Sequence, residues 1–197
     1  MGSTIANESD DVLYTWAGPE IAVASTKAYS TQLAVIYMIA LYMADQLGTV
    51  SSEDMARYME DLQRLPDLAE ECLQDKETIQ YFASQYFNAH DMYFIGRNVD
   101  YAASLEASLK LKEISYIHSE AYTGGELKHG PISLIEDGTL VIAISTYEKL
   151  FDKMMSNVRE VKARGAVVLG ITVHGKEEAL KQETDYQFRS EEHTSEL

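Results

Sequence analysis

The pattern of apolar and polar positions changes near residue 90, and before that point it has the longer period of helices. The pattern over residues 25–47 predicts a long helix that ends at Gly48, and this helix is apolar around most of its circumference over residues 33–44, which predicts burial on several sides. A serine cap and an acidic first turn predict a second helix that ends just before Pro66. Residues 67–88 predict further helix, and residues 12–15 predict a short strand.

After residue 90, short buried strands and helices alternate. The apolar runs over residues 91–96, 139–146 and 166–173 predict strands, and the helical patterns over residues 99–117 and 147–165 separate them. Strands that alternate with helices form parallel βαβ units, so the sequence predicts an α/β fold with a doubly wound parallel sheet.

The ends of these strands predict where a ligand would bind. Doubly wound sheets bind ligands outside the carboxyl ends of their strands. In this sequence those ends are Gly96–Arg97, Ser145–Thr146 and His174–Gly175.

Composition and charge narrow the class of protein. The chain is 46% hydrophobic and 24% charged, as globular proteins are, and its formal charge of -16 argues against a nucleic-acid partner. The longest apolar run, residues 33–44, is too short to span a membrane. Cys72 is the only cysteine, which excludes an internal disulfide and indicates a reducing compartment. We therefore predict a soluble cytoplasmic protein without a membrane partner.

Two segments carry residues suited to chemistry. Glu106, Lys110 and Glu113 share one helical face, and from spacing alone a solvated face with an intrahelical ion pair is the favoured interpretation. His129 lies in AYTGGELKHGPISLI, where the glycines and the Gly130–Pro131 pair predict a rigid, exposed loop. An imidazole there suits proton transfer near neutral pH, although a lone loop histidine is more often incidental.

A third segment, EIAVASTKAYSTQL, places Ser25 and Thr26 at the start of a helix, where free backbone N–H groups favour anions. From sequence physics alone, a simple helix cap is the favoured interpretation. The chain has no Walker-type phosphate loop, no dinucleotide fingerprint and no metal-ligand spacing, so we predict neither a cofactor nor a metal.

Three segments together resemble a known family. AGPEIAVASTKAYSTQLAV, FIGRNVDYAASLE and SLEASLKLKEISYIHSEAYTGGELKHGP are similar to the isomerase domain of the glutamine–fructose-6-phosphate aminotransferases. The resemblance extends to about Phe188 and implies a flavodoxin-like three-layer α/β/α fold of the sugar isomerase (SIS) type, incomplete at both ends. It divides the chain into part of a first SIS subdomain (residues 1–50), a helical connection (51–90), an incomplete second subdomain (91–188) and a non-native-looking tail (189–197).

The resemblance also implies a reaction and a set of site residues. In the family, fructose 6-phosphate is ring-opened, forms an imine with a lysine, receives ammonia at C2 and becomes glucosamine 6-phosphate. Glu113 then resembles the base that moves a proton between C1 and C2, and His129 the ring-opening histidine, which reaches into the neighbouring subunit's site of a homodimer. Lys110 resembles a lysine that lines the site. The stretch that contacts the sugar matches Val23, Ala24 and Ser25.

Parts of the family pattern are missing from this sequence. It has no glutaminase domain, no Ser/Thr-rich phosphate loop and no tail with the imine-forming lysine, so we expect the fragment to be inactive alone. The main alternative is a non-catalytic SIS module that binds a sugar phosphate. A related SIS deglycase or ketose-phosphate isomerase fits less well, because those proteins resemble the GELKHGP segment only loosely.

Overall fold

The computed structural model describes residues 2–74 and 76–190, which fall into two compact units, Met1–Leu62 and Gln63–Leu197. Each unit is described by itself. Most of the predicted non-native tail, residues 191–197, lies outside the described residues. No helix in the described ranges is long and apolar enough to cross a membrane.

The first unit contains α1 (Thr4–Glu8), α2 (Lys27–Gln46) and the start of α3 (Ser52–Gln74). The predicted long helix is present as α2, but the prediction that it is buried on several sides is wrong, because none of its residues is buried. Large side chains such as Ile36, Tyr42 and Met43 are exposed, since the rest of the first unit provides no surface that covers the helix on all sides.

Two further predictions for the first half are wrong. Residues 12–15 form no strand, because no neighbouring strand offers them backbone hydrogen bonds. Pro66 lies inside α3 rather than past its end. Proline disfavours a helix interior because it lacks the N–H that would bond the carbonyl four residues earlier, yet α3 continues for eight more residues to Gln74.

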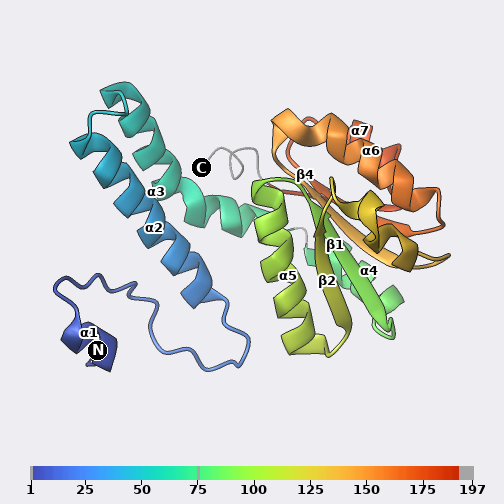
Figure 1. The fold of residues 1–197 in the computed structure, drawn as a ribbon, viewed down its shortest axis with the longest axis horizontal. Coiled ribbons are helices and arrows are strands. Elements are labelled where there is room, and N and C mark those ends of the chain that lie inside the picture. The colour runs from blue at the N-terminus through green and yellow to red at the C-terminus, as the bar shows by residue number, and fades with distance from the viewer. Residues whose placement is uncertain (1, 75, 191–197) are drawn as a thin grey trace. The chain divides into compact units, whose positions relative to one another are not determined.

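The second unit is built on one sheet of five parallel strands in the order β2-β1-β3-β4-β5 (Figure 1). The strands are β1 (Asp91–Gly96), β2 (His118–Thr123), β3 (Leu140–Ser145), β4 (Val167–Thr172) and β5 (Tyr186–Arg189). The predicted parallel α/β fold is therefore confirmed, and the three predicted strands are present as β1, β3 and β4. Strand β2 was not predicted, and the predicted helix over residues 99–117 extends past the end of α5 at Ser115.

Helices cover both faces of this sheet. They are α4 (Lys76–Tyr86), α5 (Val99–Ser115), α6 (Phe151–Lys162) and α7 (Glu177–Lys181). Short 3₁₀ turns lie between the longer elements: η1 (Leu127–His129), η2 (Pro131–Leu134) and η3 (Glu148–Leu150). This is the three-layer α/β/α arrangement that the sequence predicts.

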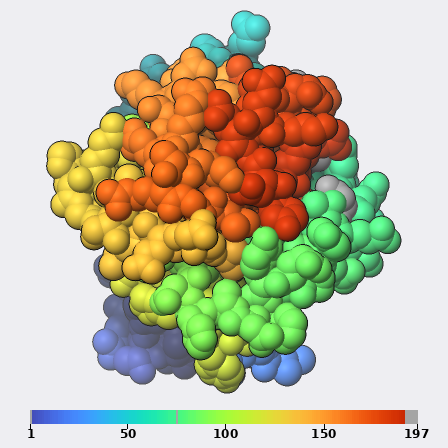
Figure 2. All heavy atoms as spheres, turned by 90° about the vertical axis from the view of Figure 1, so that its right-hand side faces the viewer, coloured from blue at the N-terminus to red at the C-terminus, as the bar shows by residue number. Residues whose placement is uncertain are grey.

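The strands divide their side chains between two cores because successive residues point to opposite faces. Met92 and Phe94 of β1 face the core that α4 and α5 cover, through residues such as Phe82 and Leu111. Tyr93 and Ile95 face the core that α6, α7 and η1 cover. Figure 1 shows α5 on one side of the strands and α6 and α7 on the other. In Figure 2, the yellow segment that carries η1 and η2 borders the orange α6.

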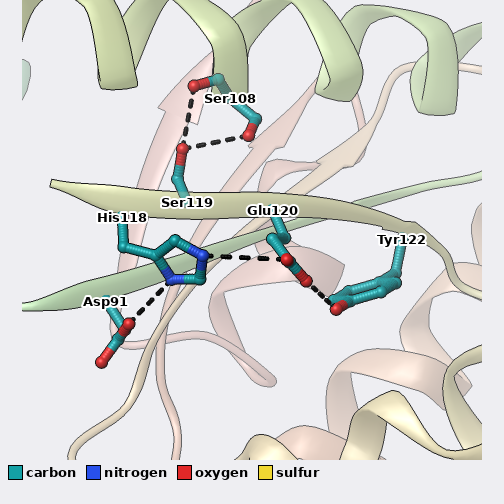
Figure 3. Close-up of polar contacts among 6 residues, drawn as sticks. All are labelled: Asp91, Ser108, His118, Ser119, Glu120 and Tyr122. Carbon is teal, nitrogen blue, oxygen red and sulfur yellow. Dashed lines mark hydrogen bonds and ion pairs between the residues drawn. The ribbon is translucent and has the colours of Figure 1, made fainter. Parts of the chain in front are cut away.

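The edge strand β2 is held to α5 by a buried pair of serines (Figure 3). The Ser119 hydroxyl donates to the Ser108 carbonyl at 2.8 Å, and the two hydroxyl oxygens are 3.0 Å apart. Both residues are buried. A small side chain at each position lets the strand and helix approach closely, and the hydrogen bonds keep both hydroxyls satisfied.

This pair gives a test of the edge packing. Ser119→Ala should lower the free energy of unfolding by about 1–3 kcal/mol, because it leaves the buried Ser108 hydroxyl without its partner. Ser108→Ala should cost less, because the Ser119 hydroxyl keeps the carbonyl as its acceptor. The double alanine variant should be more stable than Ser119→Ala alone. Urea unfolding of the three variants measures this order, and a double variant that loses the sum of the single effects would contradict it.

Candidate active site

Helix α5 presents Lys110 between two carboxylates. The Lys110 Nζ atom lies 2.6 Å from Glu113 Oε2 and 3.5 Å from Glu106 Oε1. The hydrogen bond to Glu113 raises the pKa of Lys110, although partial burial opposes the shift. Lys110 is therefore an ammonium at neutral pH. The intrahelical ion pair that the spacing favours is present.

The Glu113 carboxylate is only half engaged by this pair. Its Oε2 atom accepts the hydrogen bond from Lys110, whereas its Oε1 atom has no hydrogen bond or ion pair within the described residues. The side chain is partly buried. A carboxylate that is oriented through one oxygen and open at the other has the geometry that a general base needs.

The predicted histidine lies on η1, which follows the edge strand β2 after the turn over residues 124–126. Successive side chains of a 3₁₀ turn point in three directions because the turn has three residues. Leu127 points into the core on the α6 side, where it is fully buried. Lys128 reaches α6, where its Nζ atom lies 2.7 Å from Glu160 Oε1. His129 takes the third direction and is exposed, without a side-chain hydrogen bond within the described residues.

The glycines around His129 act differently from the prediction. Gly130 does have a positive φ of 152°, which favours glycine, and Pro131 then starts η2. Gly124 and Gly125 do not have positive φ, so the conformational freedom of glycine is not used at these two positions. Gly124 is required by space instead, because a Cβ atom there would lie 2.5 Å from Asn157 Oδ1.

Glu113 and His129 belong to elements on opposite faces of the sheet. Helix α5 packs through Ala107 and Leu111 against one core, whereas η1 packs through Leu127 against the other. Within one chain the sheet therefore lies between the two elements (Figure 1). The structure brings Lys110 and Glu113 together, and it places His129 apart from them.

The predicted sugar-contacting stretch lies in the first unit, ahead of α2. Val23 is 94% exposed, Ala24 is buried and Ser25 is partly exposed. The segment is fixed to the helix start by Lys27, whose Nζ atom donates to the Pro19 carbonyl at 2.6 Å. The Thr26 side chain makes no cap hydrogen bond, so the helix start is not the simple hydroxyl cap that the sequence favours.

The carboxyl end of β3, one of the strand ends where we predicted ligand binding, is engaged by the chain itself. Asp100 accepts hydrogen bonds from the backbone N–H groups of Thr146 and Tyr147, each at 3.1 Å, and from the Thr146 hydroxyl at 2.5 Å. Burial raises the pKa of Asp100 in spite of these three donors, which lower it. The Asp100 carboxyl group thus engages the backbone N–H groups that follow β3.

One polar cluster was missed by the sequence analysis (Figure 3). His118 of β2 contacts Asp91 through Nδ1 at 2.9 Å and Glu120 through Nε2 at 3.7 Å. The Tyr122 hydroxyl donates to Glu120. Burial, and to a smaller extent this hydrogen bond, raises the pKa of Tyr122 to about 12. The cluster alternates along β2 with Ser119 and Ala121, and that period of two was the signal that could have revealed it.

No group of histidine, cysteine or acidic side chains that could hold a metal is present among the residues the structure describes.

Comparison with known proteins identifies the family. The model of the SIS domain matches residues 85–196, more than half of the chain. The chain belongs to the SIS domain family. This places the sheet, α5 and η1 within the matched region.

Longer relatives share the sequence as well. The chain is 57% identical over 175 residues to a glutamine–fructose-6-phosphate aminotransferase (isomerizing) of Clostridium tetani, which covers 89% of this chain and 29% of the relative. It is 43% identical over 192 residues to the enzyme of that name from Thermus thermophilus, covering 98% and 32%. The chain therefore spans about 30% of the length of these curated relatives.

Solved structures show the same fold. The C-terminal domain of glucosamine-fructose-6-phosphate aminotransferase from Francisella tularensis superposes with a TM-score of 0.90 at 35% identity, over 96% of this chain and 53% of that one. A phosphosugar isomerase fold from Silicibacter pomeroyi, described as putative, gives a TM-score of 0.66 at 25% identity, over 84% and 47%.

The lack of space for a side chain at Gly124 gives a test of how the loop between β2 and η1 is packed. Gly124→Ala should lower the free energy of unfolding by about 1–3 kcal/mol, because the new methyl group overlaps the buried Asn157 amide. The matched control is Gly125→Ala, whose Cβ atom would lie 3.6 Å from its nearest neighbour, Arg97. It should change stability by less than about 0.5 kcal/mol. Equal effects in urea unfolding would show that space at Gly124 does not limit the loop.

Proposed function

We propose that this chain is the isomerase part of a glutamine–fructose-6-phosphate aminotransferase, a cytoplasmic enzyme that makes glucosamine 6-phosphate. The observation that carries the proposal is the 57% identity to a relative of that name over 89% of the chain. The fold supports it, because the C-terminal domain of a second such enzyme superposes with a TM-score of 0.90.

In this proposal Glu113 moves a proton between C1 and C2 of the open-chain sugar. Its Oε1 atom has no partner within the described residues and is available to accept that proton, while Lys110 holds the other oxygen. The Lys110 ammonium, which lies between the Glu106 and Glu113 carboxylates, keeps the Glu113 side chain in one orientation.

His129 opens the sugar ring in this proposal, by moving a proton to or from the ring oxygen. Because its element and that of Glu113 cover opposite faces of one sheet, a single chain does not present both to one substrate. A homodimer in which each subunit lends His129 to its partner's site resolves this separation. Val23, Ala24 and Ser25 are proposed to contact the sugar.

The proposal is tested by Glu113→Gln in the full-length gene product. Glutamine keeps the size of the side chain but does not accept the proton, so kcat for isomerisation of fructose 6-phosphate should fall by roughly 10²–10⁴-fold with little change in KM. Glu106→Gln is the matched control, because Glu106 is the other carboxylate beside Lys110 at 3.5 Å. It should leave the rate close to that of the wild type.

A wild-type rate in the Glu113→Gln enzyme would rule out Glu113 as the base. Tight sugar-phosphate binding without turnover in the wild-type gene product would instead favour a non-catalytic SIS binding module.

A further inference from the structure

A chain of polar contacts runs from the histidine-bearing turn through α6 to the turn between β1 and α5. Lys128 pairs with Glu160 at 2.7 Å, and the other Glu160 oxygen accepts a hydrogen bond from Asn157 Nδ2 at 3.2 Å. Asn157 Oδ1 in turn accepts from Arg97 Nε at 2.9 Å. These four residues, which we call the α6 clamp, connect η1 to the turn between β1 and α5.

Asn157 is the buried centre of the α6 clamp, with only 2% of its surface exposed. Its amide oxygen accepts and its amide nitrogen donates, so the orientation of the amide is fixed by both neighbours. The same oxygen lies where a Cβ atom of Gly124 would be. The amide therefore packs against Gly124, at the start of the loop. Through Glu160 it is also linked to Lys128, near the end of the loop.

The α6 clamp anchors η1 next to His129. The buried Leu127 anchors η1 to the core, and the backbone N–H of His129 donates to the Glu126 carbonyl at 3.0 Å. The ion pair of Lys128 with Glu160 adds a second fixed direction. Because the turn has three residues per revolution, a turn anchored through Leu127 and Lys128 leaves its third side, which carries His129, facing away from both anchors.

We propose that Glu160 and Asn157 are positioning residues for His129, which act through Lys128 and Gly124 and do not touch the substrate. This inference rests on the proposed function, in which His129 transfers a proton at the sugar ring. A proton-transfer group must lie within hydrogen-bond reach of its target, so loss of the second fixed direction reduces the fraction of productive encounters.

Kinetics of the full-length gene product test this role. Glu160→Ala should lower kcat for fructose 6-phosphate by between about 10-fold and 100-fold, with little change in KM, because a misplaced catalytic group affects the chemical step. Glu160→Gln keeps one acceptor oxygen, which can serve either Lys128 or Asn157, so it should recover part of the loss. Lys128→Met removes the other partner of this ion pair, so it should lower kcat as Glu160→Ala does.

Glu183→Ala is the matched control. The Glu183 carboxylate is 24% exposed, against 21% for Glu160, and it forms a 2.8 Å ion pair with Arg159 of α6. That pair does not involve η1, so its loss should leave kcat unchanged. An equal loss in both variants would show that α6 ion pairs act on general stability, and the positioning role would be wrong.

Side-chain NMR of the present chain provides a readout that does not need activity. The chain has five histidines, and the Hε1 signal of His129 should shift or broaden in Glu160→Ala and Lys128→Met. The signal of His118, which Asp91 holds at 2.9 Å, should not change. An unchanged His129 signal would overturn the inference.

The two proposals fail separately. If His129→Asn abolishes ring-opening turnover and Glu160→Ala has wild-type kcat, the positioning role is wrong and the proposed function stands. If His129→Asn keeps wild-type turnover, the proposed role of His129 is wrong, and the inference that depends on it fails with it.

Discussion

The separation of the two faces of one parallel sheet is the constraint on which the candidate site depends. Side chains alternate along each strand, so α5 and η1 pack against different cores and do not meet. The ion pair on α5 and the histidine on η1 therefore lie on opposite faces of the sheet, and neither depends on the other for its local contacts. A reaction that needs both requires a second copy of the sheet, which connects the packing of this chain to the proposed dimer.

The turn that carries His129 shows how a small element can present one reactive group. Leu127 binds the turn to the core, Lys128 binds it to α6, and the exposed third position is left for the histidine. Gly124 allows this arrangement because a side chain there would overlap Asn157. Much of the order around His129 thus comes from residues that lie outside the turn.

The pattern of apolar positions was sufficient to predict the buried strands β1, β3 and β4, but not the edge strand β2. Strands β1, β3 and β4 are continuous apolar runs because both of their faces are covered. Strand β2 has one neighbour and exposes part of one face, so its HSEAYT sequence carries no apolar run. The passage of α3 through Pro66 and the exposure of α2 depend on tertiary context, which local propensity does not contain.

The candidate site residues had a different source. Spacing alone predicted the ion pair of Lys110 with Glu113, and it is present, but spacing assigns it no chemistry. The proposed roles of Glu113 and His129 came from the resemblance to the aminotransferases. The α6 clamp had no sequence signal, because Arg97, Asn157 and Glu160 are brought together only by the fold.

The most direct test of the account is to co-express the Glu113→Gln and His129→Asn forms of the full-length gene product and measure turnover of fructose 6-phosphate. If each site uses Glu113 of one subunit and His129 of its partner, half of the dimers are mixed and each contains one intact site. The mixture should then recover about a quarter of the wild-type activity, although each form alone is inactive. Activity that stays at the level of the separate variants would contradict a site shared between two subunits.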